Sequence, residues 1–249
     1  MKKKAQSKIT HWTIAAIALI PGSCVSHYVP NVINAPLFSN PGQPSLAIHT
    51  GVSGVDPQFA VSITDNLALM MNASFANREY IEKESSNMFK YHKHQFFEVA
   101  AGYYYPTGSD FRVEGFAGMG KGRTRAFNDT WGTARSIDSK FTRYFIQPNI
   151  GVSMDVFEGI GSARLAMIRF EDREIGTGFY LEPALTGKAG STWLKFVFQI
   201  GFSLQLNFDI NPIEYNPFMF SIGLEAKPGK KSNSEKNSTT AKLKSAYLP

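Results

Sequence analysis

Charged side chains recur at alternate positions of several apolar segments, and they are the residues in this sequence best placed to do chemistry. They are Glu98, Arg112, Glu114, Arg143, Arg164, Glu182 and Lys195. If each segment is a strand, all seven lie on the face opposite its apolar side chains, because successive side chains of a strand point to opposite faces. Inside a narrow barrel, charges of both signs would pair into a network that fills the interior. The functional alternatives are a small pore lined by these charges or a polar ligand cavity.

Two histidines stand at alternate positions in Tyr91-His92-Lys93-His94, and His49 is a candidate for the same interior face. Imidazole is a common metal ligand, so a metal site is one interpretation. Neither a cysteine nor a nearby pair of carboxylates completes a ligand set. We therefore expect rim histidines beside a solvated loop, with no metal and no cofactor.

Enzyme chemistry on a lipid would need a nucleophile, a histidine and a carboxylate that converge. His11 and His27 belong to the leading segments, and none of the other three histidines stands beside a candidate serine on the same strand face. The run Gly118 to Gly122 resembles a phosphate-binding loop only in composition, because no strand-to-helix context surrounds it. The sequence therefore predicts no catalytic residues and a protein that is not an enzyme.

The stretch from Trp193 to Phe208 indicates which elements must position these residues. Its even positions are all leucine, isoleucine or phenylalanine, while Lys195, Gln199 and Ser203 stand among the odd ones. A period of two predicts a strand. The stretch is also longer than the roughly 9 to 11 residues with which a tilted strand crosses a bilayer.

Nine further segments alternate in a similar way. They cover residues 45–52, 58–63, 67–75, 94–105, 111–121, 141–154, 162–169, 178–186 and 217–225. We predict an all-β, antiparallel up-and-down transmembrane β-barrel of about ten strands over residues 45–225. The alternative is a soluble, lipocalin-like periplasmic barrel whose apolar faces point inward around an apolar ligand. In that alternative, Lys195 and Arg143 face water and Phe198 faces the cavity.

The connections alternate in length, as expected of outer-membrane barrels with short periplasmic turns and long outer loops. The short ones are 64–66, 106–110, 155–160 and 189–191, and the long ones are 76–93, 122–140, 170–177 and 209–216. Only the first outer connection, 53–57, breaks this pattern, because it is short. An even strand number then predicts periplasmic termini. The loops 76–93 and 122–140 are the expected surfaces for an extracellular ligand, because long outer loops meet the environment.

The residues before the barrel predict export. A basic start and the apolar run Thr13 to Ile20 indicate a signal peptide over residues 1–23, too short for a spanning helix. Cys24, the only cysteine, follows Gly22 and Ser23, where a bacterial lipoprotein signal places its acylated cysteine. Lipidation of Cys24 is predicted, although Pro21 stands where leucine is usual; plain signal cleavage is the alternative. Residues 24–44, rich in proline and asparagine, predict an irregular periplasmic leader.

The formal net charge of +6 is concentrated at the two ends of the chain. Residues 226–249 are rich in lysine and poor in apolar residues, which predicts a disordered basic tail. The part between Cys24 and Glu225 is mildly acidic, so no nucleic-acid partner is expected. The expected partners are outer-membrane lipid and the assembly machinery of that membrane.

The run Tyr28 to Phe38 (YVPNVINAPLF), followed by Gln58 to Met70 (QFAVSITDNLALM), resembles exported β-barrel proteins of the Bacteroidetes outer membrane. The resemblance covers about the first quarter of the chain in its residues and the rest only in strand rhythm. It implies a cell-envelope barrel with a lipoprotein-like signal and a structural, adhesive or porin-like small-pore role. One departure stands out. Such barrels commonly end on an aromatic strand, whereas here Phe218 and Phe220 are followed by the tail to Pro249.

Overall fold

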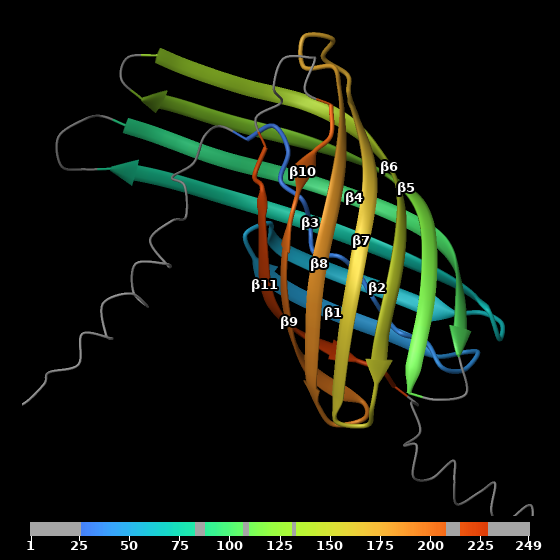
Figure 1. Cartoon of the computed structure of the whole chain (residues 1–249). Coiled ribbons are helices and arrows are strands. Elements are labelled where there is room, and N and C mark those ends of the chain that lie inside the picture. The colour runs from blue at the N-terminus through green and yellow to red at the C-terminus, as the bar shows by residue number, and fades with distance from the viewer. Residues whose placement is uncertain (1–25, 83–87, 107–109, 131–132, 208–214, 229–249) are drawn as a thin grey trace, which may run out of the picture.

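A closed β-barrel is the whole of the architecture seen in the computed structural model, which describes residues 26–82, 88–106, 110–130, 133–207 and 215–228 (Figure 1). Its strands are β1 (Pro44–Gly51), β2 (Gly54–Ser62), β3 (Leu67–Glu82), β4 (Met88–Pro106), β5 (Phe111–Thr130), β6 (Thr133–Ser153), β7 (Phe157–Phe170), β8 (Thr177–Gly190), β9 (Leu194–Phe202), β10 (Leu204–Gln205) and β11 (Phe218–Ala226). None of these described residues forms a helix long and apolar enough to span a bilayer.

Every strand pairs antiparallel with its neighbours, and β11 closes the ring by pairing with both β1 and β9. β9 and β10 are two parts of one strand, because both pair with β8 and only Ser203 separates them. The barrel therefore has ten strands, which confirms the predicted fold class. Closure leaves no unpaired sheet edge along the wall.

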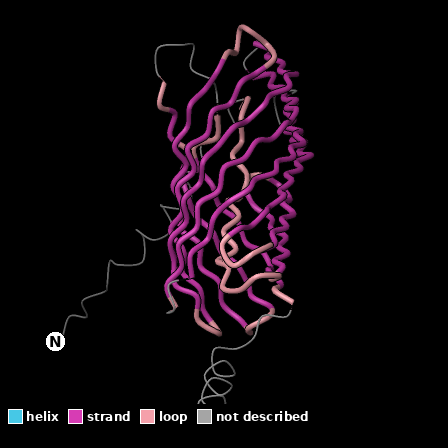
Figure 2. Tube along the Cα trace, turned by 90° about the vertical axis from the view of Figure 1, so that its right-hand side faces the viewer, coloured by secondary structure: helices cyan, strands magenta, loops and turns pink. Residues whose placement is uncertain are grey.

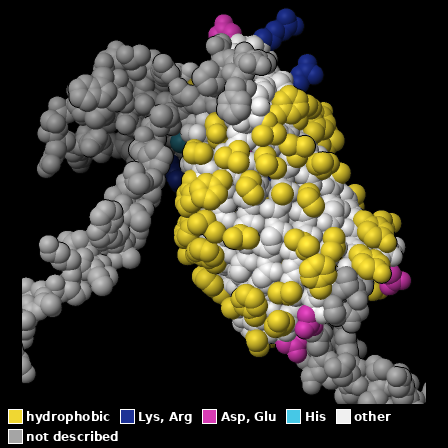
Figure 3. Space-filling view, in the orientation of Figure 1, with side chains coloured by type: hydrophobic (Ala, Val, Ile, Leu, Met, Phe, Trp, Pro, Cys, Tyr) yellow, Lys and Arg dark blue, Asp and Glu magenta, His cyan; other side chains and the backbone are white. Residues whose placement is uncertain are grey.

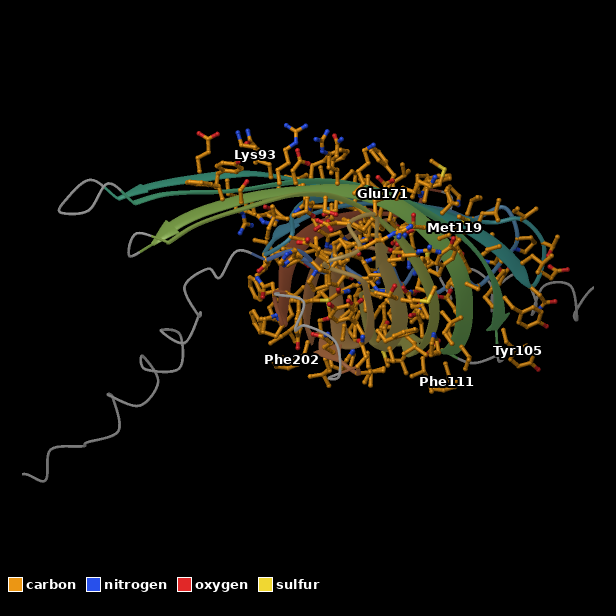
Figure 4. The ribbon with its side chains drawn as sticks, turned by 90° about the horizontal axis from the view of Figure 1, so that it is seen from above. Lys93, Tyr105, Phe111, Met119, Glu171 and Phe202 are labelled. Atoms are coloured by element: carbon orange, nitrogen blue, oxygen red, sulfur yellow. The ribbon has the colours of Figure 1, made fainter. Side chains whose placement is uncertain are left out.

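The predicted faces are the observed ones. Phe198 is 40% exposed on the outside, whereas Arg143 and Lys195 are 1% and 2% exposed and point inward. Apolar side chains cover the middle of the barrel face seen in Figure 3, and acidic and basic ones gather towards its two ends. Met119, Tyr105 and Phe202 likewise point away from the barrel axis (Figure 4). Apolar side chains such as Phe198 thus face outward, and the basic side chains of Arg143 and Lys195 face inward.

The prediction that residues 76–93 and 122–140 are loops is wrong for the residues that the structure describes. The ladder between β3 and β4 continues to the pair Glu82 and Met88, and that between β5 and β6 continues to Thr130 and Thr133. These residues (76–82, 88–94, 121–130 and 133–140) form a strand extension that leaves the barrel rim as two long hairpins (Figure 1). The apolar alternation stops at the rim because the side chains of the extension are polar or mixed on both faces, while backbone pairing goes on without it.

Other strand limits move by several residues. β2 starts at Gly54 instead of Gln58, and β8 runs through Pro183 to Gly190. The predicted single strand over Trp193 to Phe208 is broken at Ser203. We call the end with the strand extension the hairpin end, and the end with the tight connections between β2 and β3 or β8 and β9 the turn end.

The N-terminal leader, residues 26–43, does not lie outside the barrel. It runs as an irregular segment within the ring of strands, where Figure 2 shows it as a loop passing down the lumen. At the hairpin end Tyr28 forms a bridge with Tyr215, and at the turn end the Gln43 amide donates to Ser62 Oγ over 2.9 Å. The chain therefore traverses the lumen once before β1 begins.

Candidate functional site: the plugged lumen

Side chains of the barrel wall hold the backbone of the leader. Gln199 binds both sides of Ile33, accepting from its amide at 2.8 Å and donating to its carbonyl at 2.9 Å. Gln147 Nε2 donates to the Asn34 carbonyl at 2.7 Å, and Lys188 Nζ to the Ala35 carbonyl at 2.7 Å. A buried segment outside any ladder needs such partners, because unpaired backbone groups are costly away from water. Side chains of the barrel wall therefore supply the hydrogen bonds that a neighbouring strand would otherwise give to the backbone of the leader.

Aromatic packing fixes the leader at both ends. Tyr28 lies in a cluster with Phe96, Phe141 and Tyr180, its ring 5.1 Å from that of Tyr180. Phe38 is 1% exposed at the other end and packs in a second cluster that contains Tyr104, Phe116 and Phe145. Burying a phenylalanine side chain stabilises by about 1.5–3 kcal/mol. The two rings therefore anchor the leader near either end of the lumen.

Four of the seven predicted charges form one cluster near the hairpin end. Arg143 bonds Glu98, and Arg164 Nε lies 2.5 Å from Glu182 Oε2; a longer contact of 3.9 Å joins Arg164 to Glu98. All four side chains are at most 1% exposed. Two acids and two guanidinium groups balance in charge, as a buried group of this kind must.

The leader is part of that cluster. The Tyr28 hydroxyl donates to Glu182 Oε1 at 2.7 Å and accepts from Arg143 at 3.0 Å. Asn31 accepts from Arg143 at its side-chain oxygen, 2.8 Å away, and from Arg164 Nη2 at its carbonyl, 3.0 Å away. Hydrogen bonds to charged groups contribute more than neutral ones, about 1.5–3 kcal/mol each. The ion cluster and the plug therefore stabilise one another.

Lys195 belongs to a second cluster at the turn end. Lys227 Nζ lies 2.8 Å from Glu158, and Lys188 Nζ lies 2.7 Å from Glu225. Lys195 Nζ approaches Glu158 to 3.9 Å and donates to the carbonyls of residues 154 and 155. The sequence reading missed Lys188, Lys227, Glu158 and Glu225 as members of an ionic network. Alternation along the last strand predicts that Glu225 points inward. Lys227 was predicted to belong to the disordered tail, whereas the structure buries its side chain.

The two remaining predicted charges mainly contact the leader. Glu114 Oε1 accepts from the Phe38 amide at 2.7 Å, and Arg112 Nε donates to Ser39 Oγ at 3.1 Å. The leader and these side chains leave little space in the lumen. A cavity of about 10 Å³ lies between Ile33, His49 and Lys188, which is room for about one water molecule.

His92 and His94 lie on β4 at the base of the strand extension, beyond the apolar band, which is the zone of outward-facing apolar side chains on the barrel wall; His49 is buried on β1. His92 Nε2 is 3.0 Å from His94 Nδ1, and His94 Nε2 is 2.9 Å from Ser74 Oγ. The serine contact crosses between β3 and β4, so the same-strand comparison made on the sequence could not find it. Burial, and then the positive charge of Arg78, lower the pKa of His92 to about 4. Burial, and then His92 and Arg78, lower the pKa of His94 to about 3.

These contacts do not amount to a metal site or an open catalytic one. No group of three or more metal-binding side chains occurs in the part of the chain that the structure describes. Ser74 is 1% exposed, so a substrate cannot reach its hydroxyl in this conformation. What the lumen can do is hold the leader and obstruct passage. Cys24 lies outside the described residues, as does most of the predicted tail.

Comparison with known proteins adds no assignment. No family model matches the chain, and no curated protein matches its sequence.

Proposed function

We propose that this chain is a Bacteroidetes-type outer-membrane β-barrel protein with a plugged, non-conducting lumen and a structural or adhesive role at the cell surface. One observation carries the proposal. Apolar side chains face outward around the whole barrel, while the charges face a lumen that the leader occupies. Such a surface in water would exceed the apolar patches of a few hundred Å² that soluble monomers expose.

Of the alternatives, both the small pore and the lipocalin-like binder require internal space. The leader passes through the lumen from Tyr28 to Phe38, and a cavity of about 10 Å³, room for about one water molecule, lies beside it. A lipocalin-like protein would also need its apolar side chains inside. The filled interior therefore favours a structural or adhesive role over transport or storage of a ligand.

The leader changes the proposed topology of the N-terminus. Tyr28 lies beside Tyr215 at the hairpin end, whereas the Lys227 amide donates to the Trp193 carbonyl at the turn end, 2.8 Å away. Cys24 precedes Tyr28 by four residues, which span at most about 14 Å, so an acyl group on Cys24 would be on the side of the hairpin end. With the hairpin end outside, the leader would begin on the extracellular side, and β11 would end at Ala226 on the periplasmic side. The expectation that both termini are periplasmic rested on the even number of strands and did not include the path of the leader through the lumen.

Cysteine labelling tests the orientation. Single cysteines replacing Phe198 or Phe202 should resist a water-soluble maleimide in reconstituted membranes and react after the lipid is removed by detergent and denaturant. Free reaction at both positions in the folded, lipid-reconstituted protein would overturn the membrane proposal. Migration on a gel should also change on boiling, as closed barrels resist unfolding by detergent.

Conductance in planar bilayers tests the plug. The full chain should give no steady conductance, and a variant that lacks residues 28–38 should open channels or lose its fold. Steady conductance of the full chain would contradict a closed lumen. Circular dichroism of the deletion variant separates an opened barrel from an unfolded one.

A further inference from the structure

Six basic side chains lie together on the outer wall above the apolar band. This cationic patch consists of Lys93, Lys121, Arg123, Arg125, Lys140 and Arg169. Cross-strand pairing makes them neighbours: Lys93 is opposite Arg125, Arg123 is opposite Lys140, and Thr142 stands between Lys121 and Arg169. Figure 4 shows Lys93 pointing away from the barrel on the strand extension. Directly opposite residues have Cβ atoms about 4.5–5.5 Å apart, so these cations converge on one area.

Acidic neighbours neutralise only part of the patch. Asp138 takes two hydrogen bonds of 2.6 Å from Arg123, and Glu79 pairs with Lys93 at 2.5 Å. Among the residues that the structure describes, Lys121 and Arg169 have no ion-pair partner, and Lys140 acts on Asp138 only beyond ion-pair distance. Like charges on directly opposite or adjacent positions destabilise a sheet. An anion bound between these three side chains would remove that repulsion.

An apolar groove begins where the patch ends. It has a volume of about 570 Å³ and crosses the outer faces of β1 to β4 and β11, with Met71, Phe97, Val99 and Leu224 in its lining. Phe97 is the cross-strand partner of Lys121, so the groove and the patch share a border. Small residues, Ala73 among them, form its floor between larger neighbours. In a membrane lipid, a charged phosphate lies above apolar acyl chains. The outer wall has the matching arrangement, with the cationic patch above the apolar groove.

We propose that the outer wall binds lipopolysaccharide, with a lipid phosphate held by Lys121, Lys140 and Arg169 and an acyl chain in the groove beside Phe97. The inference rests on the proposed function, because it requires the apolar band to lie in a membrane with the hairpin end outside. Lysine neutralises phosphate as a point charge, and arginine can bond two of its oxygens at once. The phosphate would stand at the level of Lys121, directly above the band that contacts acyl chains.

Binding of purified lipid A to the full-length protein in neutral detergent tests this proposal. The matched probe is the same lipid with its phosphates removed. We expect the triple variant Lys121→Ala, Lys140→Ala and Arg169→Ala to weaken binding of phosphorylated lipid A at least tenfold. The charge-retaining variant Lys121→Arg, Lys140→Arg and Arg169→Lys should bind within twofold of the parent chain. Ala73→Phe should weaken binding of both lipids by filling the groove.

Arg173→Ala is the control, because Arg173 is an exposed cation outside the patch. It should leave binding unchanged. Equal affinity for the two lipids, or unchanged binding by the triple alanine variant, would overturn the proposal. Equal affinity for phosphatidylglycerol would also overturn it, by reducing the site to a general attraction for anionic lipid. Cysteine labels at Phe198 and Phe202 report membrane insertion independently, so a failed lipid assay on an inserted barrel rejects this inference alone.

Discussion

Arg164 and Glu182 in the lumen are completely buried, whereas Lys93 and Glu79 on the strand extension pair with 40% and 50% of their side chains exposed. Both pairs join an acid and a base at 2.5 Å. Their energetic roles differ, because removing one partner of a buried pair leaves a charge without solvent or counter-ion. An exposed charge is simply rehydrated. The lumen is therefore a cooperative unit, and the extension tolerates change.

The comparison also concerns binding. In the lumen, Arg143 bonds both Glu98 and the leader, and the side chains of Arg143 and Glu98 are buried away from any ligand in solution. On the outer wall, Lys121 and Arg169 are exposed where the apolar outer faces of β5 and β7 end. Charged residues thus stabilise the fold in the lumen, whereas on the outer wall they are available to bind a partner.

Replacing Arg164 tests the buried side of the comparison and should have the largest effect. Arg164→Ala leaves Glu182 buried without its guanidinium partner, which should lower the free energy of unfolding by about 3–5 kcal/mol. Urea unfolding of the reconstituted protein, followed by tryptophan fluorescence, measures the change. Arg173→Ala is the exposed control. A loss below about 1 kcal/mol would mean that the lumen is solvated and that the two regions do not differ.

A substitution in the leader tests whether the leader is part of the buried ion cluster. Asn31→Ala removes the side-chain bond from Arg143 and should cost about 1–3 kcal/mol in the same unfolding experiment. The control is again Arg173→Ala, because Arg173 is exposed and lies outside the leader. If Asn31→Ala has no effect on stability, the leader does not occupy the lumen in solution.

Acidification should destabilise the extension. Because the folded pKa values of His92 and His94, about 4 and about 3, lie below the ordinary value, the unfolded state binds more protons at acidic pH. Stability of the extension is therefore full above about pH 6.5 and falls as the pH drops from there towards 4. Amide hydrogen exchange across this range measures it. The double variant His92→Gln and His94→Gln should remove the pH dependence, and its persistence would assign the effect to other groups.

The smallest effect is expected at the exposed pair. Glu79→Gln should change the free energy of unfolding by less than about 1 kcal/mol, because surface ion pairs contribute little. Raising the salt concentration should leave the difference between variant and parent small. A change as large as that of Arg164→Ala would show that the extension is packed against something in the folded state.

Much of the barrel could be predicted because it depends on local alternation. The inward side of Arg143 and the outward side of Phe198 follow from strand parity, and so does the count of ten strands. The strand extension could not be predicted in this way. Both faces of β3 and β4 beyond Phe75 are polar or mixed, so the period-2 signal disappears while backbone pairing continues.

The ion pairs could be predicted only in part. Parity brings Glu98, Arg143, Arg164 and Glu182 to one surface, but which acid meets which base depends on strand register and on the curvature of the closed wall. Lys227 was misplaced because its neighbours in sequence form a lysine-rich run, whereas its partner Glu158 is on β7. Its burial is a property of the closed barrel end and not of the local composition.

By itself, the sequence determined which side of each strand is apolar and which is charged, because neighbouring side chains alternate regardless of what lies farther away. Only the tertiary structure decided what fills the interior. The leader has no periodic pattern, and its partners Gln199, Gln147 and Glu114 are distributed over three strands far along the chain. Closure of the wall brings those side chains around one axis, and the buried backbone of the leader then satisfies their hydrogen bonds.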